Sequence, residues 1–340
     1  MKYKKKTLKN GVRVLMVPIP GSPTVTFMVY VNAGSHHESK EENGISHFLE
    51  HMSFKGTENR LTHKDIRKDL DGIGAYNNAF TWNEYTAYYA KAHPRHLKKI
   101  INVISDLYLN SIIPKDELER ERGVVLGEID MNDDDPKSLV AKIWREMVYG
   151  DQSAGRAILG TKANIKKFKR EDFVDYKKKH YVAKKTVVVV AGDFNEEKAL
   201  VEIEKQFKNI STAKEPKKSQ VKELQKKPGI VIGNKKTDQT HISLGFRSLD
   251  LSSKPKEKAV LSVLNTILGR SMSSRLWLKV REELGLGYYI FSLTNLLTDY
   301  GYFSIKAGVS SVRVEEALNA ILGEVKILKK ELVSKEELDA

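Results

Sequence analysis

Residues 44–57 read GISHFLEHMSFKGT and place two histidines four residues apart with a glutamate between them. On an α-helix, at about 100° per residue, His47, Glu50 and His51 share one face, and apolar side chains cover the adjacent face. Two neutral imidazoles at this spacing can bind one Zn²⁺, which in catalytic sites keeps a position open for water. Glu50 is then the candidate general base. The alternative is an amphipathic helix with incidental histidines.

Length and composition suit a two-domain globular protein, with 340 residues and 40% hydrophobic content. The absence of cysteine excludes disulfides, thiolate metal sites and a cysteine nucleophile, so any metal must use nitrogen and oxygen ligands. The basic start of the chain is not followed by an apolar signal-peptide region, and no apolar run approaches about 18 residues. We therefore expect a soluble, cytoplasmic protein with no membrane partner.

The net charge of +14 raises the alternative of a basic nucleic-acid-binding protein with an incidental histidine cluster. The lysine pairs and triplets are scattered along the chain, however, and no nucleic-acid motif or patterned aromatic platform accompanies them. Solvated lysine-rich faces explain the charge better, so we expect no nucleic-acid partner.

The first part of the chain, residues 1–210, alternates strand and helix signals. Expected strands are 12–18, 24–32, 74–81, 84–91 and 186–191, and expected helices are 44–55, 62–70, 94–108, 114–133, 136–149, a group around 163–179 and 196–207. Residues 211–228 are rich in Lys, Glu, Ser and Pro with little apolar periodicity, which predicts a linker.

Residues 229–340 repeat the first part in outline, with a strand at 240–246, helices at 256–268 and 274–284, a strand at 301–308 and a helix at 312–332. Both parts carry a similar turn after their pair of helices, GIGAY at residues 72–76 and GLGY at residues 285–288. This predicts an internal duplication in an α+β fold of two related domains, and coincidence between two ordinary α+β units is the alternative. A helix start at Ser334 is cut off at the end of the chain, so we expect a truncated second domain.

The segment 44–57 resembles the inverted-motif zinc peptidases of the pitrilysin, insulinase and mitochondrial-processing-peptidase family, whose motif is HxxEH. The resemblance implies a third zinc ligand, a glutamate, at a fixed distance along the chain. Counting from His51 at the family spacing leads to Glu128, within the similar segment ERERGVVLGE. Composition alone could not have selected this residue among its acidic neighbours. The implied site is one Zn²⁺ per chain, held by His47, His51 and Glu128.

The same resemblance assigns roles to residues around the metal. Glu121, two helical turns before Glu128, matches a glutamate that supports the site without binding metal, where it would orient a histidine ligand. A surface glutamate paired with a basic residue is the alternative. Asn78 and Ala79 match positions on an edge strand to which an extended peptide adds by β-augmentation. An ordinary hairpin strand would read much the same.

Residues 281–288, REELGLGY, resemble a pair in the family's second domain that hydrogen-bonds the scissile carbonyl region. A helix-surface Arg281 and a packed Tyr288 are the alternative. In relatives this pair faces the zinc from the opposite half of a clamshell. Because the chain has the length of one half, the resemblance implies a homodimer or a heterodimer with a related chain.

The sequence thus predicts a zinc-dependent endopeptidase that hydrolyses unfolded peptides or oligopeptides. His47, His51 and Glu128 would hold the metal, Glu50 would activate the water, and Arg281 and Tyr288 would position the carbonyl. The alternative within the same family is a non-catalytic partner subunit of a two-chain peptidase.

Overall fold

The computed structural model describes residues 2–339, which divide into two compact units. The first comprises the chain up to Met131 together with Asp151–Ser219, and the second comprises Asn132–Gly150 and the chain from Gln220 onward. The units therefore interleave, whereas the ranges predicted from sequence, 1–210 and 229–340, follow the chain in order. Helix α5 (Pro136–Tyr149) accounts for the difference, because it packs against strand β7 (Thr240–Ser248) of the second unit.

The elements of the first unit match the sequence expectation closely, except that its first strand was not predicted. Its strands are β1 (Lys4–Thr7), β2 (Arg13–Pro18), β3 (Val25–Val31), β4 (Tyr76–Thr81), β5 (Thr86–Ala92) and β6 (Thr186–Gly192), and its helices are α1 (Ile45–Ser53), α2 (His63–Asp71), α3 (Leu97–Asn110), α4 (Lys115–Asp134, whose last turn falls in the second unit), α6 (Lys162–Lys167), α7 (Arg170–His180) and α8 (Glu196–Gln206). Only short 3₁₀ turns supplement them in the described range.

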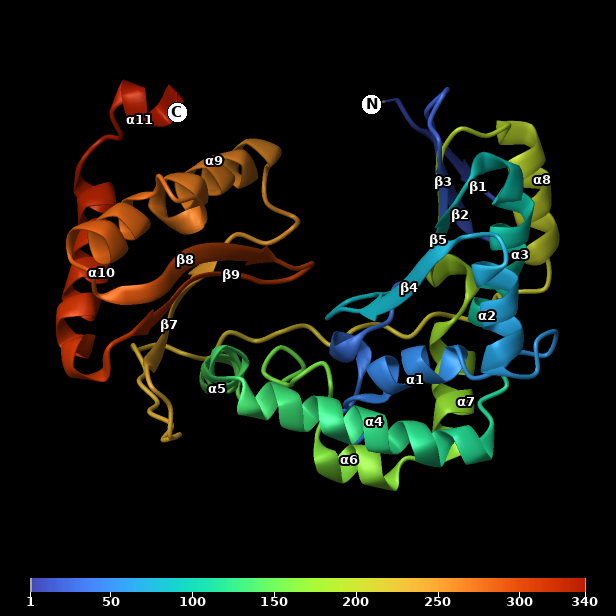
Figure 1. Cartoon of the computed structure of the whole chain (residues 1–340), viewed down its shortest axis with the longest axis horizontal. Coiled ribbons are helices and arrows are strands. Elements are labelled where there is room, and N and C mark those ends of the chain that lie inside the picture. Colours follow the sequence, from blue (N-terminus) through green and yellow to red (C-terminus); the bar gives the residue numbers. More distant parts are fainter. Residues whose placement is uncertain (1, 340) are drawn as a thin grey trace. The chain divides into compact units, whose positions relative to one another are not determined.

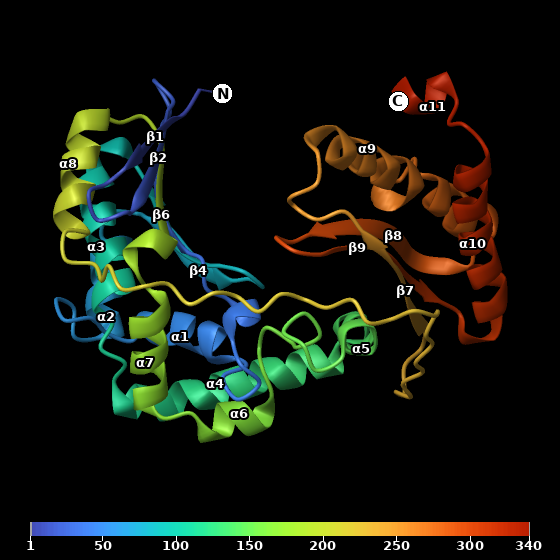
Figure 2. The same ribbon diagram turned by 180° about the vertical axis from the view of Figure 1, so that it is seen from behind.

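Across the described residues, the strands of the first unit form a six-stranded sheet in the order β1-β2-β6-β3-β5-β4, with β2 and β6 parallel and the other pairs antiparallel. Side chains of β3 and β6 alternate between buried and half-buried, as expected where one face carries the core. The helices α3 and α8 pack against each other, and α3 covers β3 and β5 (Figures 1 and 2). This confirms the predicted mostly antiparallel α+β architecture.

Helix α1 lies against the edge strand β4 (Figure 1) and also contacts β5 and α7. Because β4 ends the strand order, one side of its backbone has no strand partner among residues 2–339. The fold thus brings the HFLEH helix beside a free sheet edge.

The second unit contains α5, β7, α9 (Pro255–Asn265), β8 (Gly287–Leu296), β9 (Gly301–Val309), α10 (Val314–Lys330) and α11 (Lys335–Asp339), with π-helical turns at Thr266–Arg270 and Trp277–Glu283. Within the described chain its strands form an antiparallel sheet in the order β7-β9-β8. Strand β8 was not predicted from sequence, because as an edge strand it mixes buried, half-buried and exposed side chains without a strict alternation.

The two units share a topology, which supports the predicted internal duplication. Both run strand, helix, helix, strand, strand, helix, and both sheets place the third strand of this series between the other two. The order β3-β5-β4 in the first unit therefore corresponds to β7-β9-β8 in the second, with all of these pairings antiparallel.

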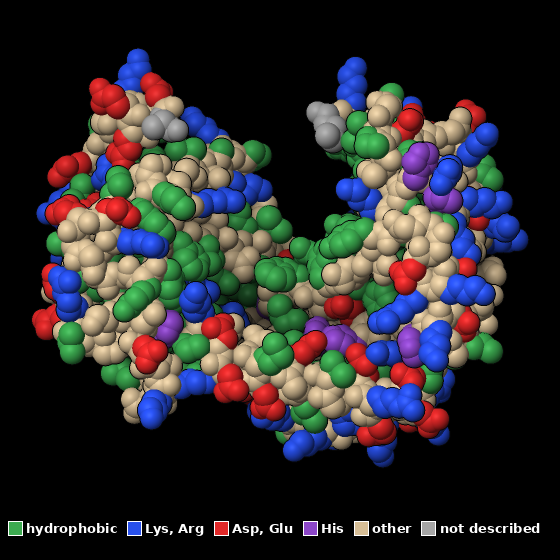
Figure 3. Space-filling view, in the orientation of Figure 1, with side chains coloured by type: hydrophobic (Ala, Val, Ile, Leu, Met, Phe, Trp, Pro, Cys, Tyr) green, Lys and Arg blue, Asp and Glu red, His purple; other side chains and the backbone are tan. Residues whose placement is uncertain are grey.

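Two global features bear on the expected partners. No helix within residues 2–339 is both long enough and apolar enough to cross a bilayer. Lysine and arginine side chains are distributed over the face shown in Figure 3 among acidic ones, without gathering into a stripe.

The segment expected as a linker, 211–228, carries no regular element, and the irregular chain continues as far as residue 239.

Candidate metal centre

The start of helix α1 depends on a glycine. Gly44 precedes the helix with φ of 102°, a left-handed conformation that strongly favours glycine. A Cβ atom at this position would lie 2.8 Å from the carbonyl oxygen of Leu159. A side chain here would therefore displace the helix from the loop on which it rests.

Glu38 caps this helix from outside it. Its buried carboxylate accepts hydrogen bonds from the backbone N–H of Gly44 at 2.8 Å and of Ser46 at 2.9 Å, and from Asn43 Nδ2 at 3.0 Å. These bonds satisfy donors that a helix start leaves unpaired. Burial raises the pKa of Glu38, although the three hydrogen bonds oppose that rise.

Helix α1 separates packing from chemistry as its sequence predicts. Phe48, Leu49 and Met52 are fully buried, and the Phe48 ring meets that of Phe173 edge-on at 4.9 Å. This anchors one face of the helix in the core. The other face directs His47, Glu50 and His51 toward α4 and β4.

Helix α4 supplies the acidic partners. Glu121 and Glu128 lie two turns apart on one face of the helix, and Glu121 is only 7% exposed. Arg122 holds the helix in place by donating to the carbonyl oxygens of Ile165 and Phe168. The carboxylates are thereby positioned against α1, which lies far from α4 in the sequence.

Three candidate ligand atoms converge. His47 Nε2 lies 3.3 Å from His51 Nε2, and Glu128 Oε2 lies 3.4 Å from the former and 3.6 Å from the latter. A tetrahedral Zn²⁺ with bonds of about 2.0–2.1 Å holds its ligand atoms about 3.3 Å apart. The donor set therefore fits zinc in both chemistry and spacing.

The protonation of the two imidazoles follows from their surroundings. Burial, and secondarily the charge of His51, lower the pKa of His47 to about 3, so this ring is neutral as a ligand must be. Burial acts to lower the pKa of His51 as well, but the hydrogen bond with Glu121 and the neighbouring carboxylates outweigh it and raise this pKa.

Glu121 orients His51 from behind. Its Oε1 accepts from His51 Nδ1 at 2.8 Å, which leaves Nε2 facing His47 and Glu128. Lys55 forms an ion pair with the other carboxylate oxygen. Burial would raise the pKa of Glu121, but its bonds to His51 and Lys55 prevail and lower it. Glu121 is therefore an ionised acceptor.

Glu50 stands apart from the donor triangle. Its Oε2 accepts from Thr81 Oγ1 of β4 at 2.6 Å, so a strand residue sets the direction of the carboxylate. Burial raises the pKa of Glu50 despite this hydrogen bond. A raised pKa suits a group that takes up a proton and then releases it near neutral pH.

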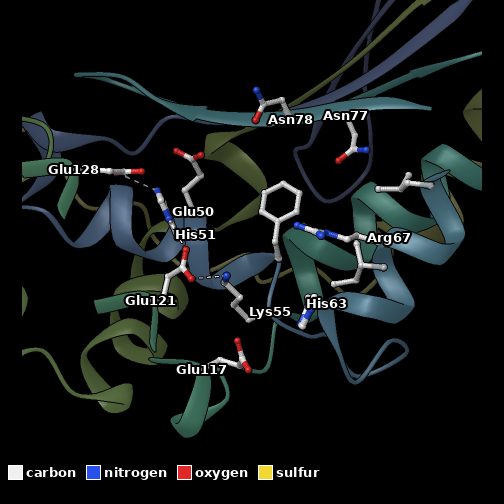
Figure 4. Close-up of a pocket in the computed structure, with 13 residues that line it drawn as sticks. Glu50, His51, Lys55, His63, Arg67, Asn77, Asn78, Glu117, Glu121 and Glu128 are labelled. Carbon is white, nitrogen blue, oxygen red and sulfur yellow. Dashed lines mark hydrogen bonds and ion pairs between the residues drawn. The ribbon is translucent and has the colours of Figure 1, made fainter. Parts of the chain in front are cut away.

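A pocket of about 540 Å³ opens beside these groups. Figure 4 shows Asn77 and Asn78 on β4 along one side of it, with Glu50, His51 and Glu121 facing them and His63 and Arg67 reaching in from α2. Asn78 Oδ1 accepts the backbone N–H of Ala79 at 2.9 Å, and Ala79 itself is buried. Both residues thus lie on the edge strand beside the donor triangle.

The remaining predicted pair lies in the second unit. Arg281 donates from Nη1 to the backbone oxygen of Tyr288 at 2.9 Å, and its guanidinium lies 4.2 Å from the centre of the Trp277 ring. The alternative required a packed Tyr288 side chain. The residue is instead 64% exposed. Its phenol is therefore available to a partner or ligand.

The residues of the site that were not predicted include Glu38, Lys55, Arg67 and Thr81. Lys55 lies beyond the end of α1 at Ser53, and its ion pair with Glu121 joins segments distant in sequence. Glu38 bonds to residues only five to eight positions later. Thr81, by contrast, contacts Glu50 of a distant segment, and Arg67 borders the pocket only through the placement of α2.

Comparison with known proteins gives consistent matches. Residues 13–162 match the family described as insulinase (peptidase family M16), and residues 167–340 match the peptidase M16 inactive domain. The chain is 34% identical to the uncharacterized zinc protease YmxG of Bacillus subtilis over 99% of its own length and 81% of that relative. It is 36% identical to an uncharacterized zinc protease of Rickettsia felis, over 91% and 74% respectively.

Solved structures agree with this fold. A protease from Helicobacter pylori superposes with a TM-score of 0.90 at 25% identity, covering 99% of this chain and 82% of that one. A peptidase M16 inactive domain from Pseudomonas fluorescens superposes with a TM-score of 0.91 at 20% identity, covering 100% and 82%, and this second likeness concerns the fold alone.

Proposed function

The chain belongs to the insulinase family of peptidases, peptidase family M16, and from this premise we propose that it is a zinc-dependent endopeptidase acting on unfolded peptides. The observation that carries the proposal is the convergence of His47, His51 and Glu128 at the spacing of zinc ligands, with Glu50 beside them. Relatives named zinc proteases support the metal and the reaction class.

The residues of the chain divide the chemistry among them. His47, His51 and Glu128 would hold the zinc ion, which when bound polarises a carbonyl group and makes water more acidic. Glu50, directed by Thr81, takes the proton of the attacking water and passes it to the leaving amine.

The edge strand β4 would bind the substrate. An extended peptide can pair with the free backbone edge of β4, which runs past Glu50. Backbone hydrogen bonds at Asn78 and Ala79 would supply affinity, once the Ala79 N–H exchanges its present acceptor, Asn78 Oδ1, for the peptide. A folded chain cannot present such a strand, so unfolded peptides or oligopeptides are the substrate class.

The proposal extends to assembly. Arg281 and Tyr288 form a matched pair in the second unit, with the phenol exposed. An arginine and a phenol are suited to stabilise the developing oxyanion of a scissile carbonyl. We assign them this role across the interface of a homodimer, or of a heterodimer with a related chain.

Digestion of a peptide library tests the metal, the general base and the peptidase function together. The zinc-loaded protein should cleave peptides, a chelator should abolish cleavage, and Glu50→Gln should lose cleavage while it retains about one zinc ion per chain. A matched Glu58→Gln variant, at an exposed residue beyond α1, controls for preparation. Undiminished cleavage by Glu50→Gln would refute the assignment.

One observation favours a second candidate, the non-catalytic partner subunit. The family described as an inactive domain matches residues 167–340, which lie outside the donor triangle. In that case the chain alone would bind zinc without cleaving peptides, and cleavage would appear only after a related chain is added. A mixture in which only this chain carries Glu50→Gln distinguishes the two functions, because cleavage should survive the substitution if the chain is non-catalytic and be lost if its own site does the chemistry.

A further inference from the structure

Helix α2 lines the pocket with one of its faces. His63, Ile66, Arg67 and Leu70 all border the pocket, and their spacing of three and four residues places them in one stripe along the helix. Ile66 and Leu70 are buried, whereas Arg67 is exposed to the pocket. Figure 4 shows the Arg67 side chain extending from α2 into the pocket beside Asn77.

The charges of the pocket are not balanced around Arg67. Lys55 is paired with Glu121, and Glu117 is paired with Arg120. No carboxylate in the part of the chain described here, residues 2–339, lies within ion-pair distance of the Arg67 guanidinium. A cation without an ion-pair partner thus borders the pocket beside Ile66 and Leu70, and the glutamates that also border it come from α1 and α4.

We propose that this pocket receives a carboxylate-bearing residue adjoining the scissile bond and that Arg67 binds the carboxylate. The inference rests on the peptidase function proposed above and adds its specificity. The planar guanidinium binds both oxygens of a carboxylate in parallel hydrogen bonds. The short apolar stem of an Asp or Glu side chain would pack on Ile66, Leu70 and Phe54, which line the same pocket.

The neighbouring lysines of α2 show why Arg67 is singled out. Lys64 and Lys68 are exposed on the same helix but do not border the pocket. Both lysines carry the same positive charge as Arg67, but neither one faces the pocket. Arg67 therefore differs from an ordinary solvated cation by the cavity that it faces, which also contains Glu50 and His51.

The carboxylate has two sources, an Asp or Glu side chain or the free C-terminus of a short peptide. Matched peptides carry Glu, Gln or Lys at each position next to the scissile bond, with an amidated or a free C-terminus. We expect the zinc-loaded protein to favour Glu over Gln in kcat/KM by about tenfold to a hundredfold. A preference seen only with free-acid peptides assigns the terminal carboxylate, and one that persists in amidated peptides assigns the side chain.

A charge reversal provides the decisive comparison. Arg67→Glu should invert the substrate preference, so that Lys peptides are cleaved faster than Glu peptides. Arg67→Lys should retain part of the preference for Glu, because it keeps the positive charge but loses the paired N–H donors of the guanidinium. Lys64→Glu, which changes net charge equally, should keep the wild-type order. Retention of the wild-type order by Arg67→Glu, or equal cleavage of Glu and Gln peptides by wild type, overturns the proposal.

Equilibrium binding of the same peptides to Glu50→Gln separates this proposal from the peptidase function. Cleavage without a Glu preference overturns the pocket assignment and leaves the peptidase function intact. Arg67-dependent binding of Glu peptides without any cleavage by the wild type supports the pocket assignment and refutes the peptidase function. Absence of any Glu preference in binding overturns the role of Arg67.

Discussion

Replacement of Glu121 by glutamine should weaken zinc binding, because the carboxylate acts on the metal through His51. The structure gives Glu121 a hydrogen bond of 2.8 Å to His51 Nδ1 and an ion pair with Lys55, at 7% exposure. Glutamine preserves shape and one acceptor oxygen but removes the charge. It replaces a bond to a charged group, worth about 1.5–3 kcal/mol, by a neutral one worth about 0.5–1.5 kcal/mol.

The lost charge also leaves the Lys55 ammonium uncompensated near the metal. Together these effects predict a rise of about tenfold to a hundredfold in the zinc Kd, or about 1.4–2.7 kcal/mol. Competition with a chromophoric chelator measures this constant. Glu117→Gln is the matched control, since Glu117 lies one turn earlier on α4 and borders the same pocket. An unchanged Kd in Glu121→Gln, or an equal loss in the control, would show that Glu121 does not act through His51.

Three further predictions concern Thr81, Glu38 and the buried histidines. Thr81→Val should lower kcat about fivefold to tenfold, because it removes one hydrogen bond. It should also move the acidic limb of the pH–rate profile to higher pH, because the Thr81 hydroxyl lowers the pKa of Glu50. An acidic limb at unchanged pH would contradict the role of Thr81 in orienting Glu50. Glu38→Gln should destabilise the first unit by about 2–3 kcal/mol, because an NH₂ group would replace one of the two oxygens that accept hydrogen bonds from Asn43, Gly44 and Ser46. Urea unfolding measures this loss, and hydrogen exchange at α1 localises it. Burial lowers the pKa of His37 and of His180 to about 3. Both rings stay neutral in the folded protein, whereas the same histidines in the unfolded chain take up protons below about pH 6.5. The free energy of unfolding therefore decreases as the pH is lowered, by about 1.4 kcal/mol per ring at pH 5.5. Denaturant midpoints at pH 7 and 5.5 for wild type and His180→Gln test this, and equal pH slopes would exclude His180.

Much of the fold was predictable because its signals are local. The strands 12–18 and 186–191 and the helices 94–108 and 114–133 lie within a few residues of their observed bounds. Their apolar periodicity and capping residues act over a single turn or strand. Strand β8 escaped prediction because it lies at a sheet edge and mixes buried with exposed side chains.

The assignment of α5 to the second unit also escaped. Its amphipathic pattern predicts a buried face but does not identify the sheet that covers it. In the structure that sheet contains β7, far along the chain. Helix existence is a local property, whereas helix placement depends on which distant surface is complementary.

The sequence by itself determined the two faces of α1, since the helical repeat alone places His47, Glu50 and His51 on one side, and the spacing shared with relatives indicated Glu128. Only the tertiary structure decided how these groups are held and what they face. The hydrogen bond from Thr81 to Glu50, that from His51 to Glu121 and the position of Arg67 in the pocket bring together segments that are distant along the chain. Such contacts arise from the packing of complete elements, which no local repeat in the sequence encodes.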